Sequence, residues 1–431
     1  MSTRALMLVM LVLSLGPGVA WAELVKGRIE QVSRKAQTLQ IGVKGRGRVI
    51  VRVGPQTRYE HAGGFADLAP PDLVEVEYEP GRPAARIRKI VFALPPGVEI
   101  DIQELIAVLQ GRRGPYFLGD ARPPKRYYAG HIPSAKPAFP GDRDAFLEAL
   151  PADKARLLVF YCGGPTCPYT GRAVKLAMEH GYRNVKGFQA GMPEWKRVKL
   201  PVHISARWLA ERLGPHHVVL DVRDPARAER GHVPTAVSMP SPRLAAMTQR
   251  FVEEDRVPVL PGVSDKGAPV TLYSDRHNTG DVLRAFKNVR DWGYKNATIL
   301  EGGFERWKEL GLPVETGALP TEIHYEKVLP PGAIPRAEFE RLAKSREGVV
   351  FLDVRSDREV AERGTLHGAV HIPLERLEEQ LDRLPRDQEI IAYCANGIRA
   401  EMAYELLRRH GYQVRFLNET IGFDQEGNYH F

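Results

Sequence analysis

Between residues 23 and 95, hydrophobic and polar residues alternate along the chain. The runs GRIEQV, QTLQIGV, RVIVRV, LVEVEYE and ARIRKIVF follow this period of two and are separated by Gly, Pro and Asp residues. A period of two is typical of strands that bury one face. We therefore predict a small all-β domain over 23–95, an antiparallel, OB-like barrel or sandwich. No cluster of His, Cys and Asp residues marks a site there, which favours a docking or structural role.

After residue 95 the pattern changes to strands that alternate with helices, which indicates parallel sheets flanked by helices. Two signatures recur three times in the same order. The first is an apolar strand that ends in Asp, followed by a basic stretch and Gly-His or a variant of it. The second is a strand that ends in Tyr, then one small residue, a polar loop and a helix that ends in Gly-Tyr. The tyrosines of the second signature are Tyr161, Tyr273 and Tyr393.

The spacing of these repeats is that of a domain, so we predict three tandem α/β domains. They cover residues 96–201, 202–318 and 319–431, and we call them the first, second and third copies. The first two copies close with a Gly/Trp element, AGMPEW and EGGFERW. The third copy lacks this element, which leaves its last helix in doubt.

The paired signatures resemble the rhodanese family. The resemblance covers about three-quarters of the chain and implies three small α/β domains, each with a five-stranded parallel sheet. It also implies an activity: family members commonly move sulfane sulfur from thiosulfate or a persulfide to a thiol acceptor, through a cysteine persulfide.

The third copy carries the complete site expected of such a domain. Cys394 follows the predicted strand 389–393, and a helix begins a few residues later. Loop N–H groups, the helix dipole and a nearby cation favour a thiolate and bind anions. We predict that Cys394 is the nucleophile; the alternative is a buried structural cysteine. The predicted anion-binding loop consists of Ala395, Asn396, Gly397, Ile398 and a solvent-exposed Arg399.

Two further features of the third copy bear on its chemistry. The spacing from Cys394 to Arg399 is C-x4-R, whereas related phosphatases use the wider C-x5-R loop, so attack on sulfur is favoured over attack on phosphate. Asp353 and Arg355, in the motif LDVR, resemble the family's Asp and basic position near the pocket. We assign them a supporting role.

The first copy is a variant. Cys162 stands where the family keeps its nucleophile, but Cys167 replaces the arginine, and the loop is two residues longer than in the third copy. The pair could resolve a persulfide into a disulfide by thiol exchange, or staple the loop. Both readings stay open, as does a role for Arg172 as the substitute cation. We predict a reversible disulfide between Cys162 and Cys167.

The second copy has Ser274 at the cysteine position, followed by Asp275. A serine forms no persulfide, and an adjacent carboxylate repels an anionic substrate. His277 lies nearby, but no nucleophile-elbow motif supports a hydrolase. We therefore predict a spacer or interaction module.

Composition narrows the function further. The chain has 431 residues, of which 43% are hydrophobic and 26% charged, as in globular proteins. The net charge of +8 comes from scattered basic residues, which does not favour nucleic-acid binding. Three cysteines exclude a four-cysteine zinc site, and no nucleotide, flavin or metal motif indicates a cofactor. The expected partners are a small sulfur-containing anion and a thiol acceptor, with a periplasmic protein partner at the second copy or the β domain.

The N-terminal residues 1–22 have the pattern of a secretory signal peptide. Arg4 precedes an apolar run that is too short to span a bilayer, and Ala20-Trp21-Ala22 forms a small-x-small cleavage site. We expect cleavage before Glu23 and a soluble periplasmic protein without stable membrane insertion. A membrane anchor is the alternative.

Together these features predict an exported sulfurtransferase. Two other functions stay open. One is a non-enzymatic protein that binds sulfur or chalcogen oxyanions, or docks to a periplasmic redox system. The other is a thiol–disulfide oxidoreductase that uses Cys162 and Cys167, although that pair lacks the usual C-x-x-C spacing.

Overall fold

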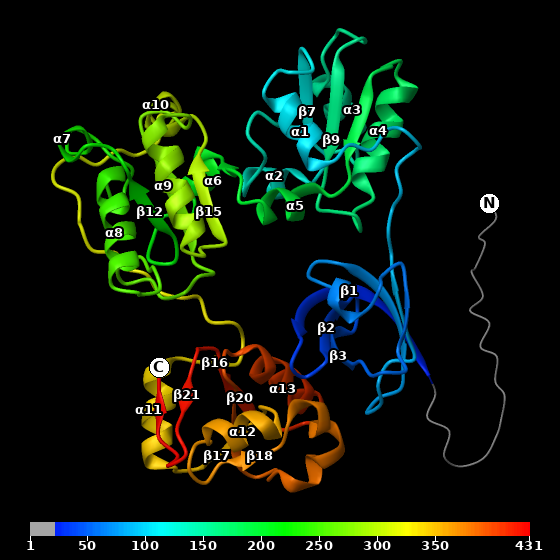
Figure 1. Ribbon diagram of the computed structural model, residues 1–431, viewed down its shortest axis with the longest axis vertical. Coiled ribbons are helices and arrows are strands. Elements are labelled where there is room, and N and C mark those ends of the chain that lie inside the picture. The colour runs from blue at the N-terminus through cyan, green and yellow to red at the C-terminus, as the bar shows by residue number, and fades with distance from the viewer. Residues whose placement is uncertain (1–21) are drawn as a thin grey trace, which may run out of the picture. The chain divides into compact units, whose positions relative to one another are not determined.

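The computed structural model describes residues 22–431, which form two compact units (Figure 1). One unit contains residues 22–90 and 329–431, so that the β domain belongs with the third copy. The other contains residues 91–328, with the first and second copies. The predicted signal peptide lies outside the described residues except for Ala22. Within residues 22–431 no helix combines the length and the hydropathy needed to cross a membrane.

The N-terminal residues form a six-stranded sheet in the order β3-β2-β1-β5-β6-β4. All neighbours are antiparallel except β4 and β6, which run parallel. Buried residues alternate with exposed ones along most of β1 and with half-buried ones along β3 and β5, as the period of two predicted. The prediction of an antiparallel β region is confirmed. We call this region, with its connecting turns, the β domain. Its strands are β1 (Glu23–Ser33), β2 (Thr38–Val43), β3 (Gly47–Arg52), β4 (Arg58–Glu60), β5 (Leu73–Tyr78) and β6 (Arg86–Lys89).

The third copy has a five-stranded parallel sheet in the order β16-β20-β19-β17-β18, with helices on both faces. Where the first two copies close with a Gly/Trp helix, it ends in the short hairpin β21–β22. The strands are β16 (Ala333–Ile334), β17 (Val349–Asp353), β18 (Val370–His371), β19 (Glu389–Tyr393), β20 (Val414–Leu417), β21 (Gly422–Phe423) and β22 (Tyr429–His430). The helices are α11 (Arg336–Ser345), α12 (Asp357–Arg363), the 3-10 segment η2 (Leu374–Arg383) and α13 (Ile398–Arg409).

The first copy has four parallel strands in the order β10-β9-β7-β8, not five. An isolated bridge between Glu99 and Gly187 stands where the fifth strand is expected. The strands are β7 (Tyr116–Asp120), β8 (Lys136–Pro137), β9 (Leu157–Tyr161) and β10 (Val185–Phe188). The helices are α1 (Ile102–Leu109), α2 (Pro124–Tyr128), α3 (Arg143–Ala149), α4 (Tyr169–Glu179) and α5 (Gly191–Arg197).

The second copy has five parallel strands in the order β11-β15-β14-β12-β13. The predicted fold class, three α/β copies behind a β region, is therefore confirmed. The strands are β11 (His203–Ile204), β12 (Val218–Asp221), β13 (Val237–Ser238), β14 (Pro269–Tyr273) and β15 (Asn296–Leu300). The helices are α6 (Ala206–Ala210), α7 (Pro225–Ala228), α8 (Ser241–Glu253), α9 (Gly280–Asp291) and α10 (Gly303–Glu309).

Each copy contains the same buried polar network, which we call the Asp–Arg–Tyr latch. The aspartate ends a central strand and binds the arginine two residues later through both carboxylate oxygens. It lies beside the tyrosine that ends the neighbouring central strand of the sheet. A fully buried carboxylate needs such partners, because an unpaired charge in the interior is strongly disfavoured. The latches are Asp120–Arg122–Tyr161, Asp221–Arg223–Tyr273 and Asp353–Arg355–Tyr393.

Candidate functional site

The Cys394 loop lies between the end of β19 and the start of α13, at the carboxyl edge of the sheet. Gly397 adopts the left-handed backbone conformation, with φ at 85°. A Cβ atom at this position would lie 2.5 Å from Asn418 Oδ1, so only glycine fits the turn. The short loop places Cys394 before the N-terminus of a twelve-residue helix, where backbone N–H groups favour negative charge.

All three cysteines lie within residues 22–431, and of these Cys394 is the free one; its side chain is fully buried. Its Sγ lies 3.8 Å from Asn396 Oδ1, which accepts the weak thiol hydrogen bond. The same Oδ1 accepts a hydrogen bond from the backbone N–H of Ile398. The loop therefore holds a thiol at a helix N-terminus, an arrangement suited to nucleophilic sulfur chemistry once a substrate gains access.

Arg399 is buried, with 4% of its side chain exposed, so the expectation that it is solvent-exposed was wrong. Both of its terminal nitrogens bind Glu359 of α12, at 2.6 and 2.9 Å. The side chain of Cys394 is close enough to interact electrostatically with this guanidinium. Arg399 thus belongs to the site, but its charge is compensated by a carboxylate that the sequence analysis did not assign.

Glu359 is a residue of the candidate site that the sequence analysis did not identify. It is the third residue of α12 and forms a capping box with Ser356, a motif that is visible in the sequence as SDRE. Burial opposes its ionisation, but hydrogen bonds from Arg399 and Lys35 hold the pKa of Glu359 well below its usual range. A capping box predicts a helix start; nothing in it indicates that the same carboxylate binds an arginine on another helix.

Asp353 and Arg355 form the latch of the third copy and do not belong to the Cys394 loop. Arg355 also donates to the carbonyl of Gly364 at 2.6 Å. In this copy Thr365 lies between the latch residues, with its hydroxyl 2.6 Å from Asp353 and 2.7 Å from Tyr393. The supporting role predicted for Asp353 and Arg355 is therefore the fixing of strand ends beneath the site.

In the first copy Cys162 and Cys167 are joined by a disulfide, and both are buried. The segment before the copy covers this loop. Phe92 donates its backbone N–H to Pro165 at 3.0 Å, and Gln189 donates to the Phe92 carbonyl at 2.7 Å. The Cys162 loop therefore presents a buried disulfide in place of a thiol.

Arg172, the candidate substitute cation of the first copy, lies on the exposed side of α4. Its guanidinium lies over the Tyr169 ring, 5.5 Å from the centroid.

In the second copy the three candidate polar residues do not form a catalytic group. Ser274 donates its hydroxyl to Asp281 at 2.8 Å, and Asp275 pairs with Arg223 and Arg227. His277 accepts the backbone N–H of Gly302 at its Nδ1 and makes no hydrogen bond to Ser274 within residues 22–431. The hydrogen-bond partner of Ser274 is thus a carboxylate and not His277, so Ser274, Asp275 and His277 do not form a Ser–His–Asp arrangement.

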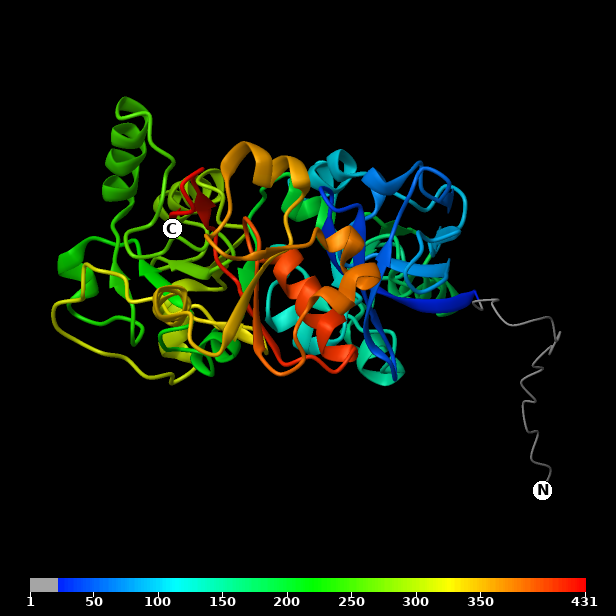
Figure 2. The same cartoon turned by 90° about the horizontal axis from the view of Figure 1, so that it is seen from below.

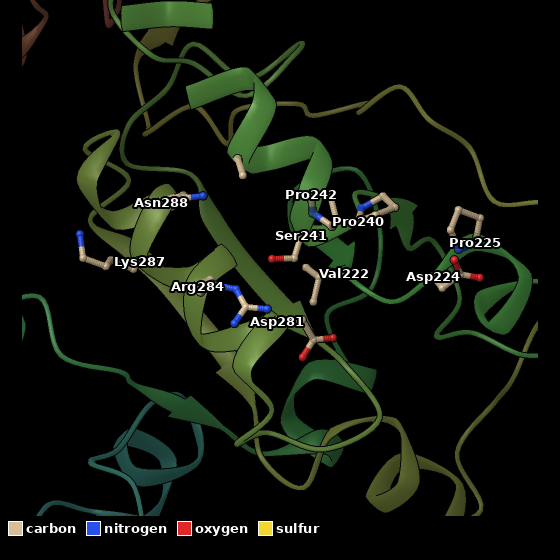
Figure 3. A pocket seen from close by; sticks show the side chains of 11 residues that line it. Val222, Asp224, Pro225, Pro240, Ser241, Pro242, Asp281, Arg284, Lys287 and Asn288 are labelled. Carbon is tan, nitrogen blue, oxygen red and sulfur yellow. The ribbon is translucent and has the colours of Figure 1, made fainter. Parts of the chain in front are cut away.

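A cavity of about 470 Å³ opens between α8 and α9 of the second copy (Figure 3). It is lined by Asp281, the hydrogen-bond partner of Ser274, and by Arg284 and Lys287. No cysteine lines this cavity, so it offers no persulfide chemistry.

A Rhodanese-like domain model matches residues 103–198, 205–310 and 336–421, which correspond to the three copies. The chain belongs to the rhodanese-like domain family. The recognition made from the paired signatures is thereby confirmed.

Individual relatives match one copy or part of the chain. A sulfurtransferase of Allochromatium vinosum is 30% identical over 73 residues, which are 17% of this chain and 66% of that protein. An HTH-type transcriptional regulator of Mycobacterium tuberculosis is 39% identical over 93 residues, 22% of this chain and 40% of the regulator. The chain thus matches less than two thirds of the length of either. A solved thiosulfate sulfurtransferase from Pseudomonas aeruginosa is 20% identical, with 75% of this chain and 64% of that chain covered and a TM-score of 0.25.

Proposed function

We propose that the chain is an exported sulfurtransferase in which Cys394 carries the sulfur as a persulfide. Sulfur transfer in general is supported by the family match and by the sulfurtransferase relative. The observation that carries the finer proposal is the place of Cys394, the single free thiol of the chain, at the N-terminus of α13 beside Arg399. Export rests on the pattern of residues 1–22 alone.

With thiosulfate as donor, the Cys394 thiolate attacks the outer, sulfane sulfur. A new S–S bond forms to Cys394, the bond between the two sulfurs of thiosulfate breaks, and sulfite leaves with the electron pair. A thiol or cyanide acceptor then attacks the terminal sulfur and regenerates the thiolate. The loop N–H groups and Arg399 stabilise the anionic donor and the terminal sulfur, because oriented donors act where charge is held.

The test is intact-mass spectrometry after incubation with thiosulfate, combined with steady-state thiosulfate:cyanide turnover. We expect a gain of one sulfur atom on the wild type and none on Cys394→Ser, with turnover lost in the same variant. Ser274→Ala is the matched control and keeps nearly full turnover, since a serine hydroxyl forms no persulfide.

One outcome would contradict the assignment of the site. If Cys394→Ser keeps most of the turnover while Cys162→Ser loses it, the first copy is the sulfur carrier. If neither cysteine takes up sulfur, the chain does not act through a persulfide.

A further inference from the structure

The β domain lies against helix α13, which begins beside the Cys394 loop; in Figures 1 and 2 the blue strands lie next to this red-orange helix. Arg48 of β3 forms an ion pair of 2.8 Å with Glu405 and one of 3.5 Å with Glu401. Gln31 of β1 also donates to Glu401. Both glutamates are largely buried, which is unusual for acidic residues of a surface helix and is explained by the β-domain partners.

A second contact joins the β domain to η2. Arg52 pairs with Glu379 at 2.8 Å and donates to the carbonyl of Glu375. The backbone N–H of Gly81 donates to Glu378 at 2.9 Å. A cavity of about 20 Å³, room for about one water molecule, lies between these surfaces.

The third contact reaches the site itself. Lys35, in the turn between β1 and β2, pairs with Glu359 at 2.8 Å, and Glu359 in turn holds Arg399. The neighbouring Ala36 is buried in the hydrophobic cluster that includes Cys394. In all three contacts the cations come from the β domain and the carboxylates from the third copy.

We propose that the β domain is a cap on the Cys394 site, held by these ion pairs, and that a sulfur donor reaches Cys394 only after the cap moves. Two observations support it: Cys394 is fully buried, and 4% of the Arg399 side chain is exposed. A thiol must meet its donor directly, so a site closed to solvent has to open before each transfer. The cap's role in turnover rests on the proposed sulfurtransferase function; its control of access to the thiol does not.

The test uses the full chain and follows the reaction of Cys394, the single free thiol, with iodoacetamide. This reagent is small and neutral, so its rate reports access and is not affected by the charge of the surface. Arg48→Glu/Arg52→Glu replaces two cap cations that do not touch Glu359 or Arg399. We expect alkylation to accelerate by roughly tenfold or more, since like charges then face each other at two contacts.

The matched control is Lys26→Glu/Lys44→Glu, which makes the same change of charge on exposed β-domain lysines with no ion pair among the described residues. We expect it to react at the wild-type rate. Arg48→Glu combined with Glu405→Arg restores the attraction and slows the reaction relative to Arg48→Glu alone.

The proposal is overturned if wild-type Cys394 reacts as fast in the native protein as in urea, or if the folded double variant reacts at the wild-type rate. Should the double variant not fold, the wild type is compared in 0.1 and 1 M NaCl. Screening of the ion pairs should raise the rate several-fold, and a constant rate would count against the cap.

Alkylation requires no sulfur substrate, so the two proposals fail separately. If charge reversal accelerates alkylation of Cys394 but thiosulfate adds no sulfur to it, the cap is supported and the sulfurtransferase function is contradicted. If the persulfide forms rapidly but charge reversal leaves the alkylation rate unchanged, the sulfurtransferase function is supported and the cap is contradicted.

Discussion

Glu359 binds both terminal nitrogens of Arg399, at 2.6 and 2.9 Å, and keeps this arginine from solvent. An anionic donor that uses Arg399 must therefore share the guanidinium with a carboxylate that is already bound. The pair lies between the Cys394 loop and Lys35 of the β domain. The same two side chains therefore interact with both the reactive thiol and the domain that we propose as its cap.

The first prediction concerns Arg399. We expect Arg399→Ala to lower kcat/KM for thiosulfate by about 10²–10³, the effect of removing one oriented donor from a buried anion site, while the backbone donors retain the remaining activity. Arg358→Ala is the control, because Arg358 is exposed on α12 and pairs with Glu362. Steady-state kinetics of both variants, with folding checked by thermal melts, is the measurement. A change of less than twofold in Arg399→Ala would show that this arginine does not bind the donor.

The second prediction concerns the latch of the third copy. Asp353→Ala leaves Arg355 as an uncompensated buried charge, and the free energy of unfolding should fall by about 3–5 kcal/mol. Asp357→Ala removes a carboxylate whose ion pair with Arg376 is exposed. This substitution should change the free energy of unfolding by less than about 1 kcal/mol. Urea unfolding measures both. Equal losses would mean that pairing of the buried latch charges is not what stabilises the copy.

The third prediction is a pH dependence centred on His203 of the second copy. Burial, with contributions from His277 and His131, lowers the pKa of His203 to about 3. The unfolded chain then binds a proton near pH 6.5 that the folded chain does not bind. The stabilisation is present above that value and is lost as the pH falls toward 3. Between pH 7 and pH 5 this group alone should remove about 2 kcal/mol.

The measurement is urea unfolding of the wild type and His203→Gln at both pH values. We expect the variant to lose less stability on acidification than the wild type does, whatever its stability at pH 7. The exposed His216→Gln should keep the wild-type pH dependence. An unchanged slope in His203→Gln would show that another group titrates.

The fourth prediction concerns the disulfide of the first copy. Alkylation in urea without reductant should label Cys394 alone, whereas prior reduction should expose all three cysteines and reoxidation should restore the Cys162–Cys167 bond. Mass spectrometry of peptides distinguishes these states. Full alkylation of Cys162 and Cys167 in freshly isolated protein would exclude both a resolving and a stapling role.

The fifth prediction concerns export. N-terminal sequencing of periplasmic material should begin at Glu23, which is also the first residue of β1. A protein that retains Met1 in a membrane fraction would contradict the signal-peptide interpretation.

Much of the third copy could be predicted from sequence, because its signals are local. The predicted strand 389–393 coincides with β19, and the helix predicted after it is α13, whose buried residues Met402 and Leu406 follow the helical period. This helix begins at Ile398, so Ile398 and Arg399, which were assigned to the loop, form its first turn. The alternation of residues in β1, β3 and β5 was equally readable, since a strand with one buried face repeats every two residues.

Features that depend on contacts distant in sequence could not be predicted in the same way. The partner of Arg399 lies 40 residues away on α12, and Arg48 meets Glu405 across 357 residues. Neither pairing leaves a period or a motif in the chain. The closing hairpin β21–β22 was missed for a different reason: its strands have two residues each, too few for alternation to be recognised.

In each copy the Asp, Arg and Tyr of the latch connect neighbouring strands of the sheet. The residue that directly follows the tyrosine takes no part in the latch. That position is Cys162, Ser274 or Cys394, and the Asp, Arg and Tyr of the latch remain in every copy. Replacement of the thiol therefore need not disturb folding, and the copy with serine at this position keeps the same Asp, Arg and Tyr network. A tandem protein organised in this way can diversify its loops one at a time, with the remaining copies still available for the original reaction.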